Sequence, residues 1–448
     1  MIVMKFGGTS VKDVEAVRRV GQVVGRERRP RLVVVSALSK VTDSLLEVAR
    51  LAEQGDATAA RQAVKALHRR HEEMAVLVRA PERRADLLSA IDTLFEDLLA
   101  IVHALSVVEE VSPRSADAIV AFGELASSRI VAAALEDAGL PSRFVDARTL
   151  LVTDAQHGAA VPDREATDER LRSVVRPLLA DGLVPVTGGF IGATPKGITT
   201  TLGRGGSDYS AALFGASLEA EEIQIWTDVD GMLTADPRVV SGPRVVERLS
   251  FDEASELAYF GAKVLHPSTI LPAVKLGIPV RILNSHRPEA PGTLITRTVP
   301  EEGEGPAAIA CKRGVTRIDI ASTRMLMAYG FLRRVFEVFE RYRTAVDMVT
   351  TSEVSVSVTV DDVRHLDPIV EALGEFAEVS TEPHMSLLCA VGDVLQDEPA
   401  MAARVVGVLE EVPLRMISQA ASRRNITVVL RQADLPHAME RLHEEFFA

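Results

Sequence analysis

The sequence is poor in cysteine, which limits the kinds of site that it can build. Only Cys311 and Cys389 occur among 448 residues. Two thiols supply neither the four ligands of a structural zinc site nor a disulfide framework. Both lie in apolar, strand-like sequence, so we interpret them as buried, reduced thiols. The sequence therefore predicts no metal centre and no disulfide scaffold.

A net positive charge and long apolar runs are also lacking. The formal net charge is −13, and no cluster of Lys and Arg marks a nucleic-acid surface. No uninterrupted apolar stretch reaches the ~18 residues of a membrane span, and the first residues, MIVMKFGG, lack the apolar core of a secretory signal. We expect a cytoplasmic protein with neither nucleic acid nor a membrane as partner. A triphosphate ligand stays compatible with this charge, because backbone N–H groups and a few local cations bind it.

The first 298 residues alternate between two patterns. Short apolar runs without polar alternation are typical of strands buried on both faces of a parallel sheet, and they lie at Ile2–Phe6, Leu32–Val35, Leu183–Val186, Ile223–Trp226 and Ile278–Leu283. Helical spacing is found between such runs at Asp13–Val24, Ser115–Ile130 and Ser207–Leu218. We predict a three-layer α/β domain over residues 1–298, with a mainly parallel central sheet. The Ala-, Leu-, Glu- and Arg-rich stretch Asp56–Val111 is predicted to be a helical excursion from it.

The chain changes character after residue 298. Residues 300–306 (PEEGEGP) combine charge with Gly and Pro and lack periodicity, so we predict a linker over residues 299–311. A helix–strand–strand pattern follows and is echoed about 70 residues later. We predict two ferredoxin-like α+β modules, each β-α-β-β-α-β, over residues 312–382 and 383–448. Their exposed strand edges favour pairing, so we expect a homodimer formed through them, with a tetramer as the alternative.

Two glycine-rich segments lie between a predicted strand and a predicted helix. In Lys5–Ser10 (KFGGTS) two glycines follow a buried strand, and Thr9 or Ser10 can cap the next helix. In Thr199–Asp208 (TTTLGRGGSD) three glycines flank Arg204. A helix N-terminus with a nearby cation binds anions, and a guanidinium grips a carboxylate or phosphate with two N–H groups. An ordinary strand–turn–helix leaves the same pattern, so spacing alone does not decide the function.

A third polar segment, Trp226–Arg238 (WTDVDGMLTADPR), follows a further buried strand. Open α/β sheets bind ligands at such strand ends, although a polar surface loop is the alternative. Together with the two glycine-rich segments and with Phe260–Pro267 (FGAKVLHP), it resembles the hallmark segments of the aspartate kinases, a family of the amino-acid kinase superfamily. The repeats after residue 310 resemble the paired ACT modules of these enzymes. Four segments in the family's order are far more specific than any one of them.

The resemblance implies an enzyme that transfers the γ-phosphoryl group of ATP, bound with Mg²⁺, to the side-chain carboxylate of L-aspartate. This is the first step toward lysine, threonine, methionine and diaminopimelate. The implied catalytic residues are Lys5, which neutralises charge on the phosphoryl group, and Asp208, which orients Lys5. The implied aspartate-binding residues are Ser39, Thr42, Glu124, Arg204, Gly205, Gly206 and Ser207, with Glu124 on the ammonium. The implied ATP-binding residues are Lys5, Gly7, Gly8, Thr227, Asp228, Asp236, Arg238 and Lys263.

These assignments agree with the chemistry of the reaction. The acceptor carboxylate is already ionised at pH 7, so transfer needs positioning and charge neutralisation rather than a general base. The two glycine-rich segments contain no histidine. Mg²⁺ is expected to be held largely by phosphate oxygens and water. Leu233 stands where close relatives carry an aromatic residue, so it is left out of the predicted ATP site.

The C-terminal modules resemble the regulatory part of monofunctional, lysine-inhibited aspartate kinases. The implied effector-binding residues are Met325, Gly330, Phe331, Leu332, Val346, Asp347, Thr351, Ser352 and Glu353. Asp347 and Glu353 would meet a cationic side chain, and turn N–H groups near Gly330 a carboxylate. We hypothesise inhibition by lysine at a site shared by two chains. Threonine, alone or with lysine, is the rival effector.

Two other functions stay open on the sequence. Another amino-acid kinase, acting on glutamate, acetylglutamate or UMP, is the first, but the paired repeats and Phe122–Leu125 (FGEL) argue against it. A catalytically silent amino-acid sensor that works only through the C-terminal repeats is the second. Intact Lys5, Arg204 and Asp208 argue against that role.

Overall fold

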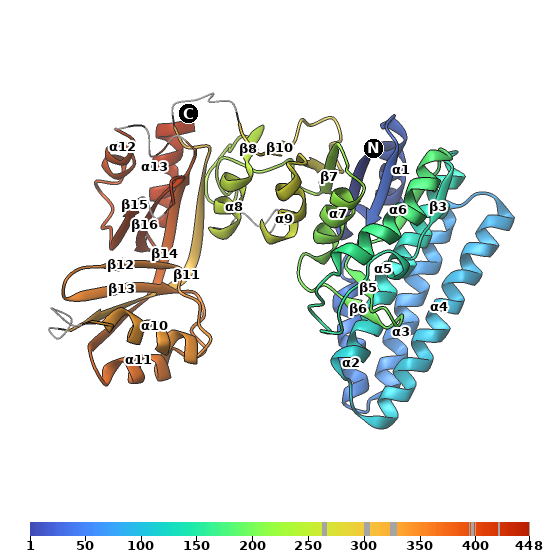
Figure 1. Cartoon of the computed structure of the whole chain (residues 1–448), viewed down its shortest axis with the longest axis horizontal. Helices are drawn as coiled ribbons and strands as arrows, with labels where there is room; N and C mark the ends of the chain where they lie inside the picture. The colour runs from blue at the N-terminus through green and yellow to red at the C-terminus, as the bar shows by residue number, and fades with distance from the viewer. Residues whose placement is uncertain are drawn as a thin grey trace. The chain divides into compact units, whose positions relative to one another are not determined.

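The computed structural model describes residues 1–261, 267–299, 305–322, 329–393, 395, 398, 400–419 and 422–447 (Figure 1). The chain forms two compact units. The first comprises Met1–Met232 and Val264–Arg297, and the second comprises Leu233–Lys263 and Thr298–Ala448. The domain boundaries that the sequence predicts, which place residues 233–263 in the first domain, stay a prediction.

A mainly parallel sheet forms the centre of the first unit. Its strands follow the order β3 (Ser142–Phe144), β4 (Val184–Gly188), β2 (Arg31–Val35), β1 (Ile2–Phe6), β7 (Glu222–Thr227), β9 (Val280–Asn284) and β10 (Thr293–Thr296). Neighbours are parallel from β3 to β9, and β10 is antiparallel to β9. All five predicted apolar runs form strands of this sheet. The prediction of a mainly parallel sheet with buried strands is therefore confirmed.

Helices and short elements complete the first unit. The helices are α1 (Val14–Arg26), α2 (Val41–Glu53), α3 (Ala57–Glu72), α4 (Pro81–Val108), α5 (Pro113–Asp137), α6 (Arg164–Ala180), α7 (Gly206–Ser217) and α9 (Pro267–Leu276). The short elements are the 3₁₀ turns η1 (Gly8–Val11), η2 (Glu73–Leu77) and η3 (Ala147–Thr149), with the hairpin strands β5 (Ile191–Ala193) and β6 (Thr199–Thr201). The predicted helical excursion is confirmed as α3 and α4, which lie beside α2 and α5 (Figure 1).

The start of α1 differs from the prediction. Asp13, rather than Thr9 or Ser10, is the N-cap, and its carboxylate accepts a hydrogen bond from the backbone N–H of Ala16 at 2.8 Å. Ser10 is buried and its hydroxyl donates to Ser285 Oγ at 2.8 Å. The η1 turn separates β1 from α1, so the last hydroxyl residue, Ser10, lies three residues before the N-cap position.

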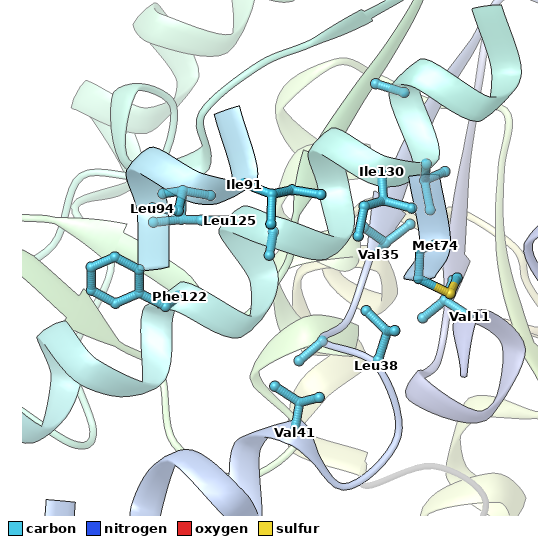
Figure 2. Packing of buried hydrophobic residues seen from close by; sticks show 14 of the residues in the cluster. Val11, Val35, Leu38, Val41, Met74, Ile91, Leu94, Phe122, Leu125 and Ile130 are labelled. Atoms are coloured by element: carbon cyan, nitrogen blue, oxygen red, sulfur yellow. The ribbon is translucent and has the colours of Figure 1, made fainter. Parts of the chain in front are cut away.

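A large apolar cluster packs α5 against the excursion and the sheet. Figure 2 shows Ile91 and Leu94 of α4 with Leu125 of α5, and Ile130 of α5 with Val35 of β2. Helix α5 is long and apolar enough to cross a membrane by composition, but 78% of its most apolar window is buried inside the protein. It is therefore a central core helix. A polar side chain on α5 is consequently withdrawn from water unless it faces a cavity.

The second unit contains a six-stranded antiparallel sheet. Its strands follow the order β12 (Met348–Thr351), β13 (Ser355–Val360), β11 (Ala308–Ala321), β14 (Glu378–Val391), β16 (Asn425–Arg431) and β15 (Met416–Gln419). Its helices are α8 (Phe251–Tyr259), α10 (Phe331–Arg341), α11 (Leu366–Gly374), α12 (Met401–Val408) and α13 (Leu435–Phe447), and β8 (Arg248–Ser250) precedes α8. The helix–strand–strand repeat is confirmed as α10-β12-β13 and α12-β15-β16.

The second copy of the repeat is not completed by its own sequence. After β16 the chain enters α13, so this copy lacks the last strand that the sequence predicts. The first half of β11 supplies that strand, because residues 308–313 pair with residues 386–391 of β14. The second half of β11 pairs with β13 and with the first half of β14. Residues 308–311, which the sequence assigns to the linker, therefore belong to the sheet.

Candidate active site

Lys5 and Asp208 meet at the carboxyl end of β1. Lys5 Nζ lies 2.6 Å from Asp208 Oδ1, and the two side chains are 10% and 17% exposed. Lys5 is carried by a central strand, paired with β2 on one side and β7 on the other. Asp208 lies in the first turn of α7, where the helix N-terminus favours a negative charge. Rigid elements thus hold both charges in place.

Glycines bring the loop before α7 into close contact with its surroundings. Gly205 precedes the helix with φ of 70°, a left-handed conformation that other residues rarely adopt. A Cβ on Gly206 would lie 2.7 Å from Phe190 Cδ2, and one on Gly189 would lie 2.7 Å from Ser207 Cβ. The turn after β4 therefore packs directly on the start of α7. Any side chain at these glycines would push the loop away.

Glu124 presents a buried carboxyl group from α5. The residue is 3% exposed, and its Oε1 accepts a hydrogen bond from the backbone N–H of Ala37 at 3.1 Å. Oε2 has no hydrogen-bond partner among the described residues. Burial raises the pKa of Glu124 to about 8, against the opposing effect of the Ala37 N–H. A positively charged group brought to Oε2 would ionise this carboxyl group.

These groups line one cavity of about 750 Å³, a usual size for a small-molecule site. The predicted residues that line it are Lys5, Thr42, Glu124, Arg204, Gly205, Gly206, Ser207 and Asp208. Arg204 is exposed, and no ion pair joins it to another described residue. The cavity thus combines two cations, Lys5 and Arg204, with hydroxyls and with the carboxyl groups of Glu124, Asp208, Asp43 and Asp117. It suits a small ligand with both anionic groups and an ammonium.

Several lining residues were missed by the sequence interpretation. They include Ser36, Asp43, Asp117, Gly158, Phe190 and Thr201. Ser36 follows β2 directly, and its hydroxyl donates to Ser207 Oγ at 3.0 Å. Its place at a strand end is a signal that could have identified it. Thr201 lies in the glycine-rich segment Thr199–Asp208, whereas the others come from segments without a recognisable motif.

The first glycine-rich segment differs in detail from the prediction. The Gly7 N–H donates to the Trp226 carbonyl at 3.0 Å, so it is not free to bind a phosphate. Gly8 serves close packing, because a Cβ there would lie 2.9 Å from the Ala37 carbonyl oxygen. The Ser39 N–H donates to the Gly8 carbonyl at 3.1 Å, and Ser39 is not among the residues that line the cavity.

The remaining predicted ATP residues divide between the two units. Thr227 ends β7, and its hydroxyl donates to Asp228 Oδ1 at 3.2 Å in the first unit. Asp236 and Arg238 belong to the second unit and form an ion pair of 2.7 Å. The hydrogen bond from the Arg238 side chain lowers the pKa of Asp236. Lys263 lies outside the described residues.

The predicted effector residues that the structure describes lie in two segments of the second unit, around the start of α10 and around β12. Gly330 precedes α10 with φ of 83°, and Phe331 is buried edge-on against Phe376. Val346 and Asp347 precede β12, whereas Thr351 ends it and Ser352 and Glu353 follow it. A strand of this length holds its two ends roughly 13 Å apart. Leu332 is partly exposed on α10, and Met325 lies outside the described residues.

Asp347 is occupied by a lysine of the same chain. Lys312 Nζ lies 2.6 Å from Asp347 Oδ1 and 2.6 Å from Asp361 Oδ2. The Asp347 side chain is 3% exposed, and burial raises its pKa although Lys312 opposes the shift. Asp347 also lines a cavity of about 520 Å³ within the second unit, together with Glu256 and Tyr259. An ammonium group is therefore already accommodated beside this carboxylate.

Known proteins match both parts of the chain. Residues 1–284 match the amino acid kinase family, and residues 388–446 match an ACT domain family. The lysine-sensitive aspartokinase 3 of Escherichia coli (strain K12) is 36% identical over 458 residues, which cover 100% of this chain and 99% of that protein. The chloroplastic aspartokinase 1 of Arabidopsis thaliana is 38% identical over 466 residues, which cover 99% of this chain and 80% of that protein.

Solved structures give the same result. The structure of E. coli aspartokinase III in complex with lysine and aspartate, in the T state, matches with a TM-score of 0.84 at 35% identity. The structure of the same enzyme with aspartate and ADP, in the R state, matches with a TM-score of 0.82 at 35% identity. In both cases the match covers 100% of this chain and 100% of the other. The similarity therefore includes both the kinase part and the ACT part.

Proposed function

Because the chain belongs to the aspartokinases of the amino acid kinase family, we propose that it transfers the γ-phosphoryl group of ATP to the side-chain carboxylate of L-aspartate. The product is 4-phospho-L-aspartate, the first intermediate toward lysine, threonine, methionine and diaminopimelate, formed in the cytoplasm. The observation that carries the proposal is the Lys5–Asp208 pair in the wall of the cavity that also exposes Glu124 and Arg204. The aspartate-bound structures of E. coli aspartokinase III support it.

The charges of the cavity match the charges of aspartate. Glu124 binds the ammonium through Oε2, which has no hydrogen-bond partner in the described part of the chain. Arg204 binds a carboxylate through its planar N–H groups, and the Ser207 hydroxyl adds a further contact. Thr42 and the Gly205–Gly206 backbone close the wall around the ligand. These contacts leave the second carboxylate as the nucleophile.

Lys5 and Asp208 stabilise the charge that develops during phosphoryl transfer. Lys5 neutralises the oxygens of the phosphoryl group as this group passes to the carboxylate, and Asp208 holds the Lys5 ammonium in position. No protein group removes a proton, since the nucleophile is an ionised carboxylate. ATP enters with Mg²⁺ bound by phosphate oxygens and water. We place the triphosphate at the strand-end edge near Thr227 and Asp228 of the first unit, and the ATP-binding roles of Asp236, Arg238 and Lys263 stay predictions from the resemblance.

Substrate choice tests the proposal directly. We expect ADP release from Mg-ATP to depend on L-aspartate, with turnover on the order of 1–100 s⁻¹. L-glutamate is expected to react at least about 100-fold more slowly, because one extra methylene shifts the reacting carboxylate by about 1 Å from its position. The measurement is coupled ADP release, with hydroxylamine trapping of the acyl phosphate. Equal rates with glutamate, or turnover only with acetylglutamate or UMP, would contradict the proposal.

We also propose that lysine inhibits the enzyme at a site shared by two chains. The E. coli relative is named lysine-sensitive, and its T-state structure contains lysine. In this chain the predicted effector residues that the structure describes lie around the start of α10 and around β12, and the site shared by two chains rests on the resemblance to lysine-inhibited aspartate kinases. The enzyme is accordingly proposed to be a homodimer formed through its ACT modules, with a tetramer as the larger alternative.

Lys312→Met is expected to strengthen lysine inhibition. The Lys312 ammonium competes with the effector for Asp347, because both need the same buried carboxylate. Removing it should lower the lysine concentration for half inhibition by about 3- to 10-fold, which corresponds to roughly 1 kcal/mol. Lys196→Met, in an exposed turn of the first unit, is the matched control. An unchanged or higher half-inhibitory concentration of lysine would contradict competition between Lys312 and the effector for Asp347. If threonine alone inhibits the enzyme, threonine rather than lysine is the effector.

A further inference from the structure

Asp117 is a buried carboxylate in the cavity that the reaction itself does not use. It lies on α5 seven residues before Glu124, which places both on one face of the helix, roughly 10 Å apart along its axis. Asp117 is 2% exposed, and both residues line the 750 Å³ cavity. One helix thus carries the proposed ammonium ligand and a second carboxylate.

The Asp117 carboxylate joins two loops to α5. The Thr201 hydroxyl donates to its Oδ1 at 2.6 Å, and the Gly158 N–H lies 3.1 Å from each carboxylate oxygen. His157 Nδ1 lies 2.8 Å from Oδ2. Thr201 ends β6, directly before the glycine-rich loop, and Gly158 belongs to a turn between η3 and α6. A single side chain therefore connects three separate segments of the first unit.

The two loops in turn hold the segment that carries Arg204. The Ala160 N–H donates to the Thr201 carbonyl at 2.9 Å, so the loops are also bonded to each other. A Cβ on Gly203 would lie 3.0 Å from the Gly158 carbonyl oxygen, so the glycine-rich loop rests on the turn at Gly158. Arg204 follows immediately and is exposed. Its own side chain has no ion pair within the described part of the chain, so its position depends on this backbone support.

We infer that Asp117 is a positioning residue that sets the distance between Arg204 and Glu124, and thereby selects a four-carbon over a five-carbon acidic amino acid. The inference rests on the proposed use of the cavity for aspartate. A carboxylate is needed because all three neighbours present donor groups or a ring nitrogen that can donate, and both oxygens accept. An amide at this position would turn an N–H group toward one of those donors. The loop would then relax, and the spacing that rejects glutamate would be lost.

Asp117→Asn is expected to alter aspartate recognition more than ATP recognition. The KM for aspartate should rise about 10-fold or more, and the aspartate-to-glutamate ratio of kcat/KM should fall by a similar factor, because a displacement of about 1 Å costs about 100-fold. The KM for ATP should change less than twofold. The matched control is Asp168→Asn on α6, whose carboxylate accepts from the Ser217 hydroxyl and from Arg164 Nε outside the cavity lining. It should lower thermal stability and leave both KM values and the ratio unchanged.

Thr201 supplies a milder variant in case Asp117→Asn does not fold. Thr201→Val removes one of the bonds to Asp117 and should shift the KM for aspartate and the ratio in the same direction, whereas Thr201→Ser keeps the hydroxyl and should restore both. Equal changes in the KM for ATP and for aspartate, or a loss of stability alone, would overturn the inference. A wild-type enzyme without preference for aspartate would instead contradict the proposed function. If folded Asp117→Asn and Thr201→Val prefer aspartate over glutamate as strongly as the wild type does, only the role of Asp117 is overturned.

Discussion

Lys5→Met is expected to lower kcat by about 10³-fold, with a much smaller change in the KM for aspartate. Cationic groups that meet a phosphoryl group in transit contribute 10³–10⁵ in rate in related chemistry. Lys5 lies on the central strand β1 and its side chain is 10% exposed. It is the one cationic residue of this strand, so the strand offers no second cation to replace it. Methionine preserves the apolar stem while removing the charge. The measurement is steady-state ADP release, with aspartate binding followed by calorimetry.

A double variant separates the lost charge from the lost ion pair. Lys5→Met leaves Asp208 unpaired and 17% exposed, which destabilises the fold. Adding Asp208→Asn removes that unpaired charge, so thermal stability should recover while kcat stays low. Lys12→Met, at an exposed position before α1, is the control for the loss of a lysine. Recovery of kcat in the double variant would show that Lys5 acts only by balancing Asp208.

Features with a local signal could be predicted from the sequence. The five runs form strands because each is short, mainly apolar and without the regular polar alternation of a strand that faces water on one side. Lys5, Arg204 and Asp208 could be identified as candidates because they belong to two glycine-rich segments, each of which follows a predicted strand and precedes a predicted helix. Glu124 was found only through the family resemblance. Its burial follows from the packing of α5, and no pattern within five residues of Glu124 reports that packing.

Features that depend on distant pairing could not be predicted. Asp117 and Thr201 are 84 residues apart, and although Thr201 lies in the glycine-rich segment, Asp117 belongs to no motif that would pair the two. The Lys312–Asp347 pair joins β11 to the residue just before β12, and the sequence did not reveal how these two segments are placed in the sheet. The strand that completes the second ACT module precedes the first module in the chain. In each case the feature is stabilised by contacts between segments that are distant in the sequence, and nothing in either segment identifies the other as its partner.

Glu124→Gln is expected to raise the KM for aspartate by about 10- to 100-fold and to leave the KM for ATP nearly unchanged. A hydrogen bond to a charged group contributes about 1.5–3 kcal/mol, and glutamine cannot offer the charge. The Ala37 N–H can still donate to the amide oxygen, so the local backbone should be preserved. Glu136→Gln, near the C-terminal end of the same helix, is the control. A KM for aspartate within threefold of the wild type would exclude Glu124 as the ammonium ligand.

Titration of Glu124 should make aspartate affinity rise with pH and make the contribution of Glu124 to stability fall with pH. Since burial raises its pKa to about 8, the carboxyl group is protonated at neutral pH and must release a proton when it binds an ammonium. Aspartate affinity should therefore weaken by about tenfold per pH unit between pH 7.5 and 6, with proton release visible as a buffer-dependent binding enthalpy. Glu124→Gln should remove both effects.

Stability without substrate should change in the other direction. The folded protein holds the Glu124 proton up to about pH 8, whereas the unfolded chain loses it near 4.5, the ordinary pKa of a glutamate. The unfolded state therefore binds fewer protons between these values, and the contribution of Glu124 to stability falls as pH rises through this window. Glu124→Gln does not titrate, so its melting temperature relative to the wild type should increase from pH 5 to pH 8. A difference that stays constant with pH would show that the carboxyl group titrates normally, and the substrate ammonium would then not be needed to ionise it.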